Sequence, residues 1–331
     1  MKKILNCAVI GLGVGARHAE TIQLNKFTNL KVLCDFDEKI LNYYSKRFPN
    51  ADIYKNSDEL FKRKDIDLVV IASYDNYHYN HIKKSIENKF HFFVEKPFCL
   101  NKKEFSDIKK LLKKNPKIKF SSNLILRNHP FFKMLKKDSF FKSIGKIYHF
   151  ETSYNYGRLF KLKKGWRGKI PFYSVVLGGG IHLIDLILNL NNYSEIKSVF
   201  SVGNNISTKN SPFKFNDIVT TILKFKNNVT AKVTSNFSCV MRHNHVFDIY
   251  GKNKTIRYNF NKIEEHFSRD PSLKFKTKKL QYSKIEKSKI LHSFILSLTN
   301  KKYKPLIQKN QIYTLMDACF KIENNLNKQK K

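Results

Sequence analysis

The stretch Gly11-Leu12-Gly13-Val14-Gly15-Ala16-Arg17-His18 follows an apolar run over residues 4–10 and precedes a helix-like run over residues 16–26. A β-strand that ends in glycines and continues as a helix leaves backbone N–H groups at one spot, beside the positive end of the helix dipole. Gly11 permits the tight turn and Gly13 the close approach of a phosphate, while Ala16 takes the third fingerprint position. The stretch therefore predicts a pyrophosphate site; a plain glycine turn is the alternative.

A carboxylate lies where such a fold requires one. An apolar run over residues 30–33 predicts a second strand, which ends near Asp35, 24 residues after Gly11. In a dinucleotide site this carboxylate accepts hydrogen bonds from the adenosine ribose. A negative charge there repels a 2′-phosphate, so Asp35 favours NAD over NADP as the cofactor.

The bulk composition is that of a folded protein with two domains. The chain has 331 residues, of which 41% are hydrophobic, and this suffices for two cores. Its formal charge is +37, from 63 Lys and Arg against 26 Asp and Glu. A field of this sign attracts nucleic acids, anionic membranes or phosphorylated substrates. Because the lysines are scattered and no recognised nucleic-acid module accompanies them, we expect no nucleic-acid partner.

The cysteines and the first residues indicate the cellular setting. The five cysteines are widely separated and lack CxxC spacing, so we expect reduced thiols, no disulfide framework and no metal site. Residues 1–16 imitate a signal peptide, but glycines fill the second half and no small-x-small cleavage site follows. No run reaches the ~20 apolar residues of a membrane span. We therefore expect a cytoplasmic protein without a membrane partner.

Helical and strand patterns alternate up to residue 123, which predicts a parallel sheet with helices on both faces. Helices are expected over residues 38–47, from residue 58 and over 79–88, and strands near 51–54, 67–72 and 91–94. Such sheets bind ligands at the carboxyl ends of their strands, which places Ser73, Tyr74 and Asn76 on the cofactor side. Glu95-Lys96-Pro97 directly follows the last of these strands and aims one ammonium group at a substrate; a surface ion pair is the alternative.

Beyond residue 123 the pattern changes. Strand-like runs over residues 146–154, 197–202, 217–225, 230–237 and 245–251 predict a largely antiparallel sheet. The lysine-rich stretch 274–289 is expected as a solvated edge strand. Helical spacing over residues 290–298 and 310–326 predicts two packing helices. We therefore expect one domain over residues 1–123 and a second over 124–331, whose last helix packs back near the junction.

The richest polar stretch lies between Tyr154 and Asp185. The triple glycine Gly178-Gly179-Gly180 is expected to open a helix and to let a ligand approach the backbone, with His182 in the first turn. His182 and Asp185 are three residues apart and share a helical face. Trp166, beside Arg167, either stacks on a sugar or base or fills the core.

Several motifs follow one another in a fixed order along the chain. The first are Gly11-x-Gly13-x-Gly15-x-x-His18, Cys34-Asp35, Ala72-Ser73-(x)4-His78 and Glu95-Lys96-Pro97. The later ones are Asn123-(x)3-Arg127-x-x-Pro130, Ile144-Gly145-Lys146-Ile147, the stretch from Gly180 to Asp185, and Tyr250-Gly251-Lys252. At these spacings the set resembles the Gfo/Idh/MocA family of NAD(P)-dependent sugar and cyclitol dehydrogenases, over nearly the whole chain.

The resemblance implies an α/β fold with an N-terminal Rossmann domain, a doubly wound parallel sheet, and a C-terminal α+β domain. The second domain has a large, mostly antiparallel open sheet, whose far face often forms the interface of a homodimer or homotetramer. The implied cofactor residues are Gly11, Leu12, Gly13, Val14, Gly15, Ala16, Asp35, Ser73, Tyr74, Asn76, His78, Glu95 and Lys96. The implied substrate residues are Asn123, Arg127, Tyr154, Tyr156, Trp166, Arg167, His182 and Asp185. Lys96 is implied as alkoxide stabiliser and proton relay, and His182 as general acid and base.

One position departs from the family pattern. The aspartate that the family usually has four residues before its catalytic histidine is replaced by Gly178. Asp185, Tyr173 or a substrate phosphate are candidates to compensate. Arg127, Arg158, Lys163 and Arg167 suit a phosphorylated or carboxylated sugar, so we expect a nucleotide-linked sugar of surface-polysaccharide or glycan biosynthesis. The alternatives are a cyclitol or free-sugar dehydrogenase and a regulator or scaffold with weakened catalysis.

Overall fold

The computed structural model describes residues 3–280 and 284–328. The chain divides into two compact units. Unit 1 comprises the residues up to Leu124 together with Lys287–Tyr313, and unit 2 comprises Ile125–Glu286 and the residues from Thr314 onward. Helices α10 (Lys284–Thr299) and α11 (Lys309–Lys328) therefore each contribute residues to both units. None of the helices in the described residues is long and apolar enough to span a membrane.

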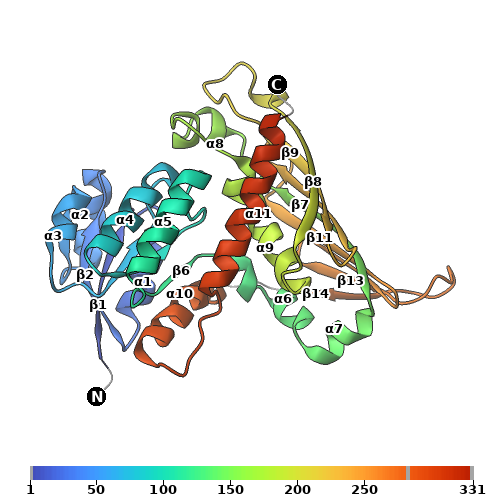
Figure 1. Ribbon diagram of the computed structural model, residues 1–331, viewed down its shortest axis with the longest axis horizontal. Coiled ribbons are helices and arrows are strands. Elements are labelled where there is room, and N and C mark those ends of the chain that lie inside the picture. Colours follow the sequence, from blue (N-terminus) through green and yellow to red (C-terminus); the bar gives the residue numbers. More distant parts are fainter. Residues whose placement is uncertain (1–2, 281–283, 329–331) are drawn as a thin grey trace. The chain divides into compact units, whose positions relative to one another are not determined.

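Unit 1 is built on a sheet of parallel strands in the order β3-β2-β1-β4-β5-β6, here called sheet A (Figure 1). The strands are β1 (Leu5–Ile10), β2 (Thr28–Cys34), β3 (Asp52–Tyr54), β4 (Leu68–Ile71), β5 (His91–Val94) and β6 (Phe120–Ser122). The helices between them are α1 (Gly15–Gln23), α2 (Glu38–Arg47), α3 (Ser57–Lys62), α4 (His78–Glu87) and α5 (Lys102–Lys114). This is the strand order of dinucleotide-binding sheets, with the change of direction between β1 and β4. The predicted doubly wound parallel sheet is confirmed.

Local sequence explains why these elements form. All four residues of β4 are apolar and buried, as expected for a strand in the middle of a parallel sheet. Helices α2, α3 and α5 begin at side-chain caps, in which Asp37, Asn56 and Asn101 accept hydrogen bonds from backbone N–H groups of the first turn. These caps fix where each helix starts relative to the preceding strand.

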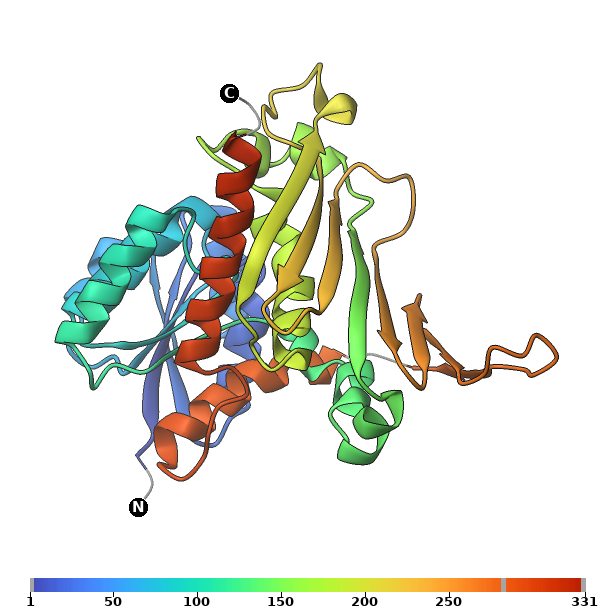
Figure 2. The same ribbon diagram turned by 45° about the vertical axis from the view of Figure 1, so that its right-hand side comes forward.

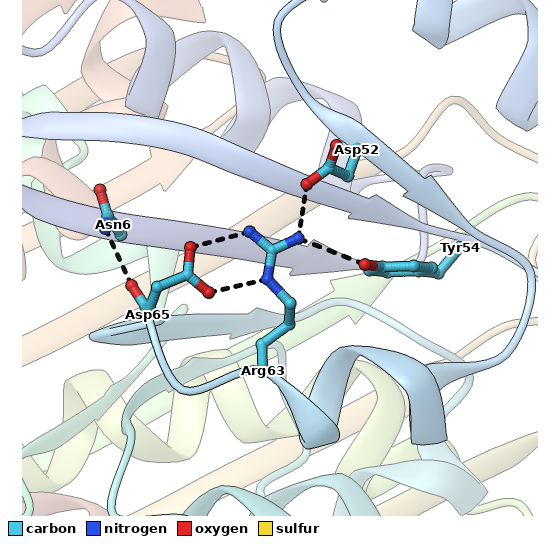
Figure 3. A network of polar contacts seen from close by, with 5 residues as sticks. All are labelled: Asn6, Asp52, Tyr54, Arg63 and Asp65. Carbon is cyan, nitrogen blue, oxygen red and sulfur yellow. Dashed lines mark hydrogen bonds and ion pairs between the residues drawn. The ribbon is translucent and has the colours of Figure 1, made fainter.

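A polar network around Arg63 links the edge strand β3 to β1 (Figure 3). Arg63 follows α3 and donates two hydrogen bonds to the Asp65 carboxylate, at 2.7 and 2.8 Å. Its Nη1 also contacts the side chains of Asp52 and Tyr54 on β3. The Asp65 carbonyl accepts a hydrogen bond from Asn6 on β1 at 2.8 Å. The network thus holds both ends of the short edge strand β3.

Unit 2 is built on sheet B, with strand order β14-β13-β12-β11-β7-β10-β9-β8 (Figure 2). The strands are β7 (Ile147–Asn155), β8 (Ile196–Asn204), β9 (Ile218–Phe225), β10 (Thr230–Asn236), β11 (Asn244–Gly251), β12 (Thr255–Asn259), β13 (Lys262–His266) and β14 (Lys276–Lys279). Strands β7 and β10 pair in parallel, and the other neighbours pair antiparallel. The predicted large, mostly antiparallel sheet is confirmed.

One long buried helix packs against sheet B within unit 2. Helix α9 (Ile181–Leu190) packs on β7 and β10, and nine of its ten residues are buried. The shorter helical segments of unit 2 are η2 (Ile125–Asn128), α6 (Pro130–Leu135), α7 (Asp138–Ile144), α8 (Phe160–Lys163), η3 (Trp166–Gly168), η4 (Val176–Gly180) and η5 (Ile206–Thr208). The C-terminal part of α11 is fixed to unit 2 by Glu323, which accepts a hydrogen bond from Ser174.

Three features of unit 2 differ from the sequence predictions. Helix α7 and strands β12 and β13 have no counterpart among the predicted elements, because their runs of five to seven residues are too short to show a clear period. The stretch 274–289 is an edge strand only over β14, whose residues are all exposed; residues from Lys284 belong to α10, and 281–283 lie outside the described residues. The triple glycine does not open α9 but lies inside the preceding π-helical turn η4.

Candidate functional site

The glycine loop after β1 leaves space for a ligand. Gly11 has a φ of +85°, and a Cβ atom there would overlap the carbonyl oxygen of Ala72, so only glycine fits. At Gly13, in contrast, a Cβ atom would meet no heavy atom within 4 Å. Helix α1 begins at Gly15, so the unbonded N–H groups of its first turn lie at this loop. The geometry fits the pyrophosphate of a dinucleotide, which stays our prediction for residues 11–16.

Asp35, after the end of β2, holds the same loop. Its Oδ2 accepts a hydrogen bond from the backbone N–H of Leu12 at 2.6 Å, and its Oδ1 accepts one from the backbone N–H of Asp37 at 3.0 Å. Each carboxylate oxygen has a second lone pair, so the Asp35 side chain can also accept the predicted hydrogen bonds from a ribose. Beside it, Phe36 and Tyr74 form an edge-to-face pair with ring centres 5.6 Å apart, and Phe36 is 61% exposed. Phe36 was not among the predicted residues.

Histidines fix the loop that follows β4. His78 is fully buried, and its ring nitrogens lie 2.7 Å from the carbonyl oxygen of Pro97 and 3.0 Å from that of Ser73. The Ser73 hydroxyl lies 3.0 Å from Nδ1 of His81, whose Nε2 lies 3.2 Å from the hydroxyl of Ser57. Burial and neighbouring positive charges lower the pKa of His81 to about 4, so its ring is neutral at pH 7. The structure therefore gives His78 and Ser73 bonds within the protein, and their predicted cofactor contacts stay predictions.

Two buried amide oxygens follow strands of sheet A at its carboxyl end. Asn76 Oδ1 lies in the turn η1 (Asp75–Tyr77) after β4, and Asn123 Oδ1 lies directly after β6. Within the described residues neither oxygen has a hydrogen-bond partner. A buried acceptor without a donor costs ~1–3 kcal/mol, so a bound group that donates a hydrogen bond to either oxygen would remove that cost. At the carboxyl end of sheet A, these two oxygens can accept hydrogen bonds from the amide or hydroxyl groups of a ligand.

Glu95 is the centre of a polar cluster at this end of sheet A. Its Oε1 accepts hydrogen bonds from Nε2 of His18 at 2.9 Å and from Nδ2 of Asn123 at 2.6 Å. The side chains of His18 and Glu95 are only 6% and 13% exposed. Burial raises the pKa of Glu95, but the bonds from His18 and Asn123 and the Lys96 charge outweigh it, so this pKa lies below its ordinary value.

Lys96 continues the loop that begins at Glu95. The first residue of this loop continues the hydrogen bonding of sheet A, because the backbone N–H of Glu95 donates to the carbonyl of Ile71 on β4 at 2.8 Å. The peptide bond between Lys96 and Pro97 is cis, and the Pro97 carbonyl faces His78. Both neighbours of Lys96 are thus held by buried side chains, which positions its backbone.

In unit 2 the triple glycine is packed against side chains of the same chain. A Cβ atom at Gly178 would overlap the hydroxyl of Tyr173, and one at Gly179 would lie 2.5 Å from the Tyr154 ring and 2.7 Å from Phe237. A Cβ atom at Gly180 would overlap the hydroxyl of Ser235. The prediction that a ligand approaches this backbone is therefore wrong, because tyrosine, phenylalanine and serine side chains fill the space.

Aromatic and histidine rings gather around Tyr154. Its ring centre lies 6.3 Å from that of His182, and 5.1 Å from those of both His243 and His245. Tyr156 directly follows the end of β7, and its ring centre lies 5.3 Å from that of His243. Burial raises the pKa of Tyr154 well above its ordinary value. Burial acts in the same direction on Tyr156, but the positive charges of Arg167, Lys161 and Arg158 lower its pKa below the ordinary value.

Arg167 links the only tryptophan to this group of rings. Its guanidinium lies 4.5 Å from the centre of the Trp166 ring, and its Nε donates a hydrogen bond to the Tyr173 hydroxyl at 3.0 Å. Arg158 lies 5.3 Å from the ring centre of Tyr156. Two of the four predicted basic residues therefore lie at the aromatic group, whereas Lys163 is exposed on α8.

Arg127, the fourth of the predicted basic residues, forms a buried ion pair within unit 2. Arg127 donates hydrogen bonds of 2.6 Å to both carboxylate oxygens of Asp185 and a third of 2.6 Å to the Tyr193 hydroxyl. The side chains of Arg127 and Asp185 are 2% and 1% exposed. The pair joins η2 to α9 inside unit 2. Asp185 is one of the three candidates to compensate for the missing aspartate, and the bonds of both its carboxylate oxygens to Arg127 argue against that role. The predicted substrate contacts of both residues stay predictions.

Three residues of these clusters were absent from the predicted site. His18 was visible as the last position of the glycine motif, but spacing alone did not indicate its bond to Glu95. His243 and His245 are two apart, a spacing that puts both on one face of a strand. Only the pairing of β11 with β7 brings that face to Tyr154. No group of three His, Cys, Asp or Glu residues able to hold a metal occurs in the parts of the chain that the structure describes.

Comparisons with known proteins cover both units. Residues 5–123 match the model of the oxidoreductase family with an NAD-binding Rossmann fold, and residues 142–257 match that of the GFO/IDH/MocA C-terminal domain. An uncharacterized oxidoreductase of Schizosaccharomyces pombe is 29% identical over 197 residues, 56% of this chain and 51% of the relative. The chain thus spans about half the length of that curated relative.

Solved structures match over almost the full length. Levoglucosan dehydrogenase, in complex with NADH and levoglucosan, has a TM-score of 0.84 at 18% identity, with 98% of each chain covered. UDP-N-acetylglucosamine 3-dehydrogenase from Acidithiobacillus ferrooxidans has a TM-score of 0.78 at 16% identity, again with 98% of each chain covered. At these identities the likeness shows the fold. Because both domain models match in order along the sequence, the chain belongs to the Gfo/Idh/MocA family of oxidoreductases.

Proposed function

We propose that the protein is an NAD-dependent oxidoreductase that transfers hydride between the nicotinamide and a hydroxyl or keto carbon of an anionic sugar. One observation carries this proposal: the loop from Gly11 to Gly15 is open at Gly13 and is held by the carboxylate of Asp35. This combination accommodates a pyrophosphate and an unmodified ribose. Similarity to proteins named levoglucosan dehydrogenase and UDP-N-acetylglucosamine 3-dehydrogenase supports a sugar as substrate.

The proposed chemistry needs one group for the proton and one for the developing charge. When bound, NAD supplies the acceptor for the hydride. The Lys96 ammonium stabilises the alkoxide that forms as the hydroxyl loses its proton, and the imidazole of His182 takes up or returns that proton. His78 and Glu95 hold the loop on both sides of Lys96 and so position its side chain.

Tyr173 takes the place of the aspartate that the family usually has at position 178. Its hydroxyl occupies the space where a side chain at Gly178 would begin, and this hydroxyl accepts a hydrogen bond from Arg167. We propose that Tyr173 is a positioning residue of the catalytic site. The group bonded to its hydroxyl is the positively charged Arg167, whereas the usual family pattern has a negative carboxylate at position 178.

The substrate-side stretch indicates an anionic group on the sugar. From Tyr154 to His182 the sequence contains six Lys or Arg residues and no Asp or Glu. Of these, Arg158 and Arg167 lie against the aromatic rings of Tyr156, Trp166 and Tyr173. Guanidinium groups recognise carboxylates and phosphates by paired hydrogen bonds, and aromatic rings stack on sugars. We propose a phosphorylated, carboxylated or nucleotide-linked sugar, used in polysaccharide or glycan biosynthesis.

Turnover assays test this function. Purified protein with NAD+ is offered levoglucosan, UDP-N-acetylglucosamine, a hexose phosphate and a uronic acid, and NADH formation is followed at 340 nm; reductions are followed with the matching keto sugars. We expect turnover with an acidic or nucleotide-linked sugar and a loss of at least a hundredfold in Lys96→Ala and His182→Asn. Tight NADH binding without turnover on any sugar would support the alternative of a regulator with this fold.

The cellular setting and assembly are further parts of the proposal. We propose that the protein works in the cytoplasm as a homodimer or homotetramer that binds neither nucleic acid nor membrane. Light scattering after gel filtration is expected to give two or four times the 39.0 kDa mass of the chain. A monomer at micromolar concentration would contradict the assembly but leave the catalytic proposal intact.

A further inference from the structure

Glu95 has a different environment on each of its carboxylate oxygens. The hydrogen bonds from His18 and Asn123 both reach Oε1. Within the described residues Oε2 accepts no hydrogen bond, although the side chain is only 13% exposed. The carboxylate is thus held through Oε1. Its Oε2 can still accept hydrogen bonds or contact a positively charged group.

The Glu95 carboxylate is charged at neutral pH. The two hydrogen bonds and the neighbouring Lys96 charge hold its pKa below the ordinary value in spite of burial. A fixed charge in a poorly solvated place acts more strongly on its neighbours than one in water. Such a group discriminates between molecules that differ only in charge.

Glu95 also stands at a defined place in the chain. It follows β5 at the carboxyl end of sheet A, where ligands of doubly wound sheets bind, and it directly precedes Lys96. In the proposed function Lys96 contacts the oxygen of the reacting carbon, and hydride transfer requires that carbon to touch the nicotinamide. The residue next to Lys96 is therefore close to the reacting ring as well.

We propose that the Glu95 carboxylate, held by His18 and Asn123, sets the preference between the two oxidation states of the cofactor by stabilising the cationic nicotinamide of NAD+ over the neutral ring of NADH. The two forms carry the same adenosine, riboses and pyrophosphate and differ at the nicotinamide, so a fixed charge beside that ring changes their relative affinities. Lys96 acts in the opposite direction, and the pair sets the balance. This inference rests on the proposed function.

The alternative is a purely structural role, in which Glu95 only clamps the loop that carries Lys96. A clamp acts on the shape of the site and weakens the binding of both cofactor forms together. The proposed charge effect instead changes the ratio of the two dissociation constants. Equilibrium binding of NAD+ and of NADH, each measured alone, separates the two roles and requires no substrate.

The experiment is calorimetric titration of the full chain with NAD+ and with NADH at pH 7.5. In Glu95→Gln, whose amide oxygen can still accept the two hydrogen bonds, we expect the ratio Kd(NAD+)/Kd(NADH) to rise about tenfold. Lys96→Met is expected to lower the same ratio severalfold, which keeps the test decisive if one variant does not fold. The matched control is Asp67→Asn, a carboxylate of similar exposure before β4 at the opposite end of sheet A.

The possible results distinguish a failure of the proposed charge effect from a failure of the proposed function. A ratio that stays within twofold of wild type in both Glu95→Gln and Lys96→Met overturns the charge effect, as does an equal shift in Asp67→Asn. Wild-type protein that binds neither NAD+ nor NADH overturns the proposed function itself. Shifts of opposite sign in the two variants, with an unchanged control, support the inference.

Discussion

The two glycine-rich stretches of this chain look alike in sequence and differ in what surrounds them. At Gly13 the space that a side chain would take is open, whereas at Gly178, Gly179 and Gly180 it is filled by side chains of the same unit. Glycine permits close approach in both places, but a ligand is the expected neighbour in the first and the protein in the second. Glycine clusters thus mark close contacts without telling which partner makes them.

The largest expected effect is on folding stability, at Gly179. An alanine methyl there would lie 2.5 Å from the Tyr154 ring and 2.7 Å from Phe237, both buried and unable to move aside cheaply. We expect Gly179→Ala to lower the free energy of unfolding by about 3 kcal/mol, although alanine in a helix ordinarily stabilises by ~1 kcal/mol. Urea denaturation measures this, and an unchanged midpoint would mean that the space is not filled.

The second effect is on cofactor binding, at Gly13. A methyl group at this position meets no protein atom, so Gly13→Ala should unfold within ~0.5 kcal/mol of wild type. We expect its affinity for NADH to fall at least tenfold, because the methyl group takes the place of the approaching phosphate. Thermal unfolding with and without NADH reports both quantities on one sample. A destabilised protein with normal affinity would reverse the contrast between the two stretches.

A third prediction concerns the hydroxyl in the space beside Gly178. Tyr173→Phe keeps the ring but removes the acceptor of the Arg167 hydrogen bond. We expect kcat to fall about tenfold with KM changed less than threefold, on the sugar that the turnover assays identify. The control is Tyr258→Phe, which removes another buried hydroxyl of unit 2, bonded to His129 and Asn261. Equal losses in both variants would contradict a positioning role.

The smallest expected effect is on the pKa of one side chain, Tyr156. Burial raises the pKa of Tyr156, but the charges of Arg167, Lys161 and Arg158 lower it overall, which stabilises the phenolate. Removing one of these charges in Arg158→Ala should raise this pKa. Absorbance at 295 nm during a pH titration, compared with the Tyr156→Phe variant, follows the phenolate. A pKa that stays the same or falls would show that Arg158 does not act on this ring.

Much of unit 1 could be predicted because its signals are local. Helix α2 and strand β5 appear over the predicted residues, since the Asp37 cap marks the start of the helix and an apolar run marks the strand. The polar ends of the strands meet because parallel strands bring their carboxyl ends to one edge. The site around Glu95 is therefore largely a consequence of motif order.

Unit 2 was harder to predict because its contacts join distant residues. Arg127 and Asp185 are 58 residues apart, and no periodicity links them. His243 reaches the Tyr154 ring only through the pairing of β11 with β7. The place of Tyr173 beside Gly178 depends on a loop without regular secondary structure, whose conformation follows from packing. Sequence patterns report faces and ends of elements, and they do not report which side chain fills a given space.

The central claim is that the chain binds NAD at the loop after β1, with Asp35 as the group that excludes a 2′-phosphate. Calorimetric titration of the wild-type protein with NADH and with NADPH tests it most directly. We expect NADH to bind with a dissociation constant in the micromolar range and NADPH at least tenfold more weakly, about 1.4 kcal/mol. Failure of both to bind at millimolar concentration would contradict the account, and preference for NADPH would contradict the role of Asp35.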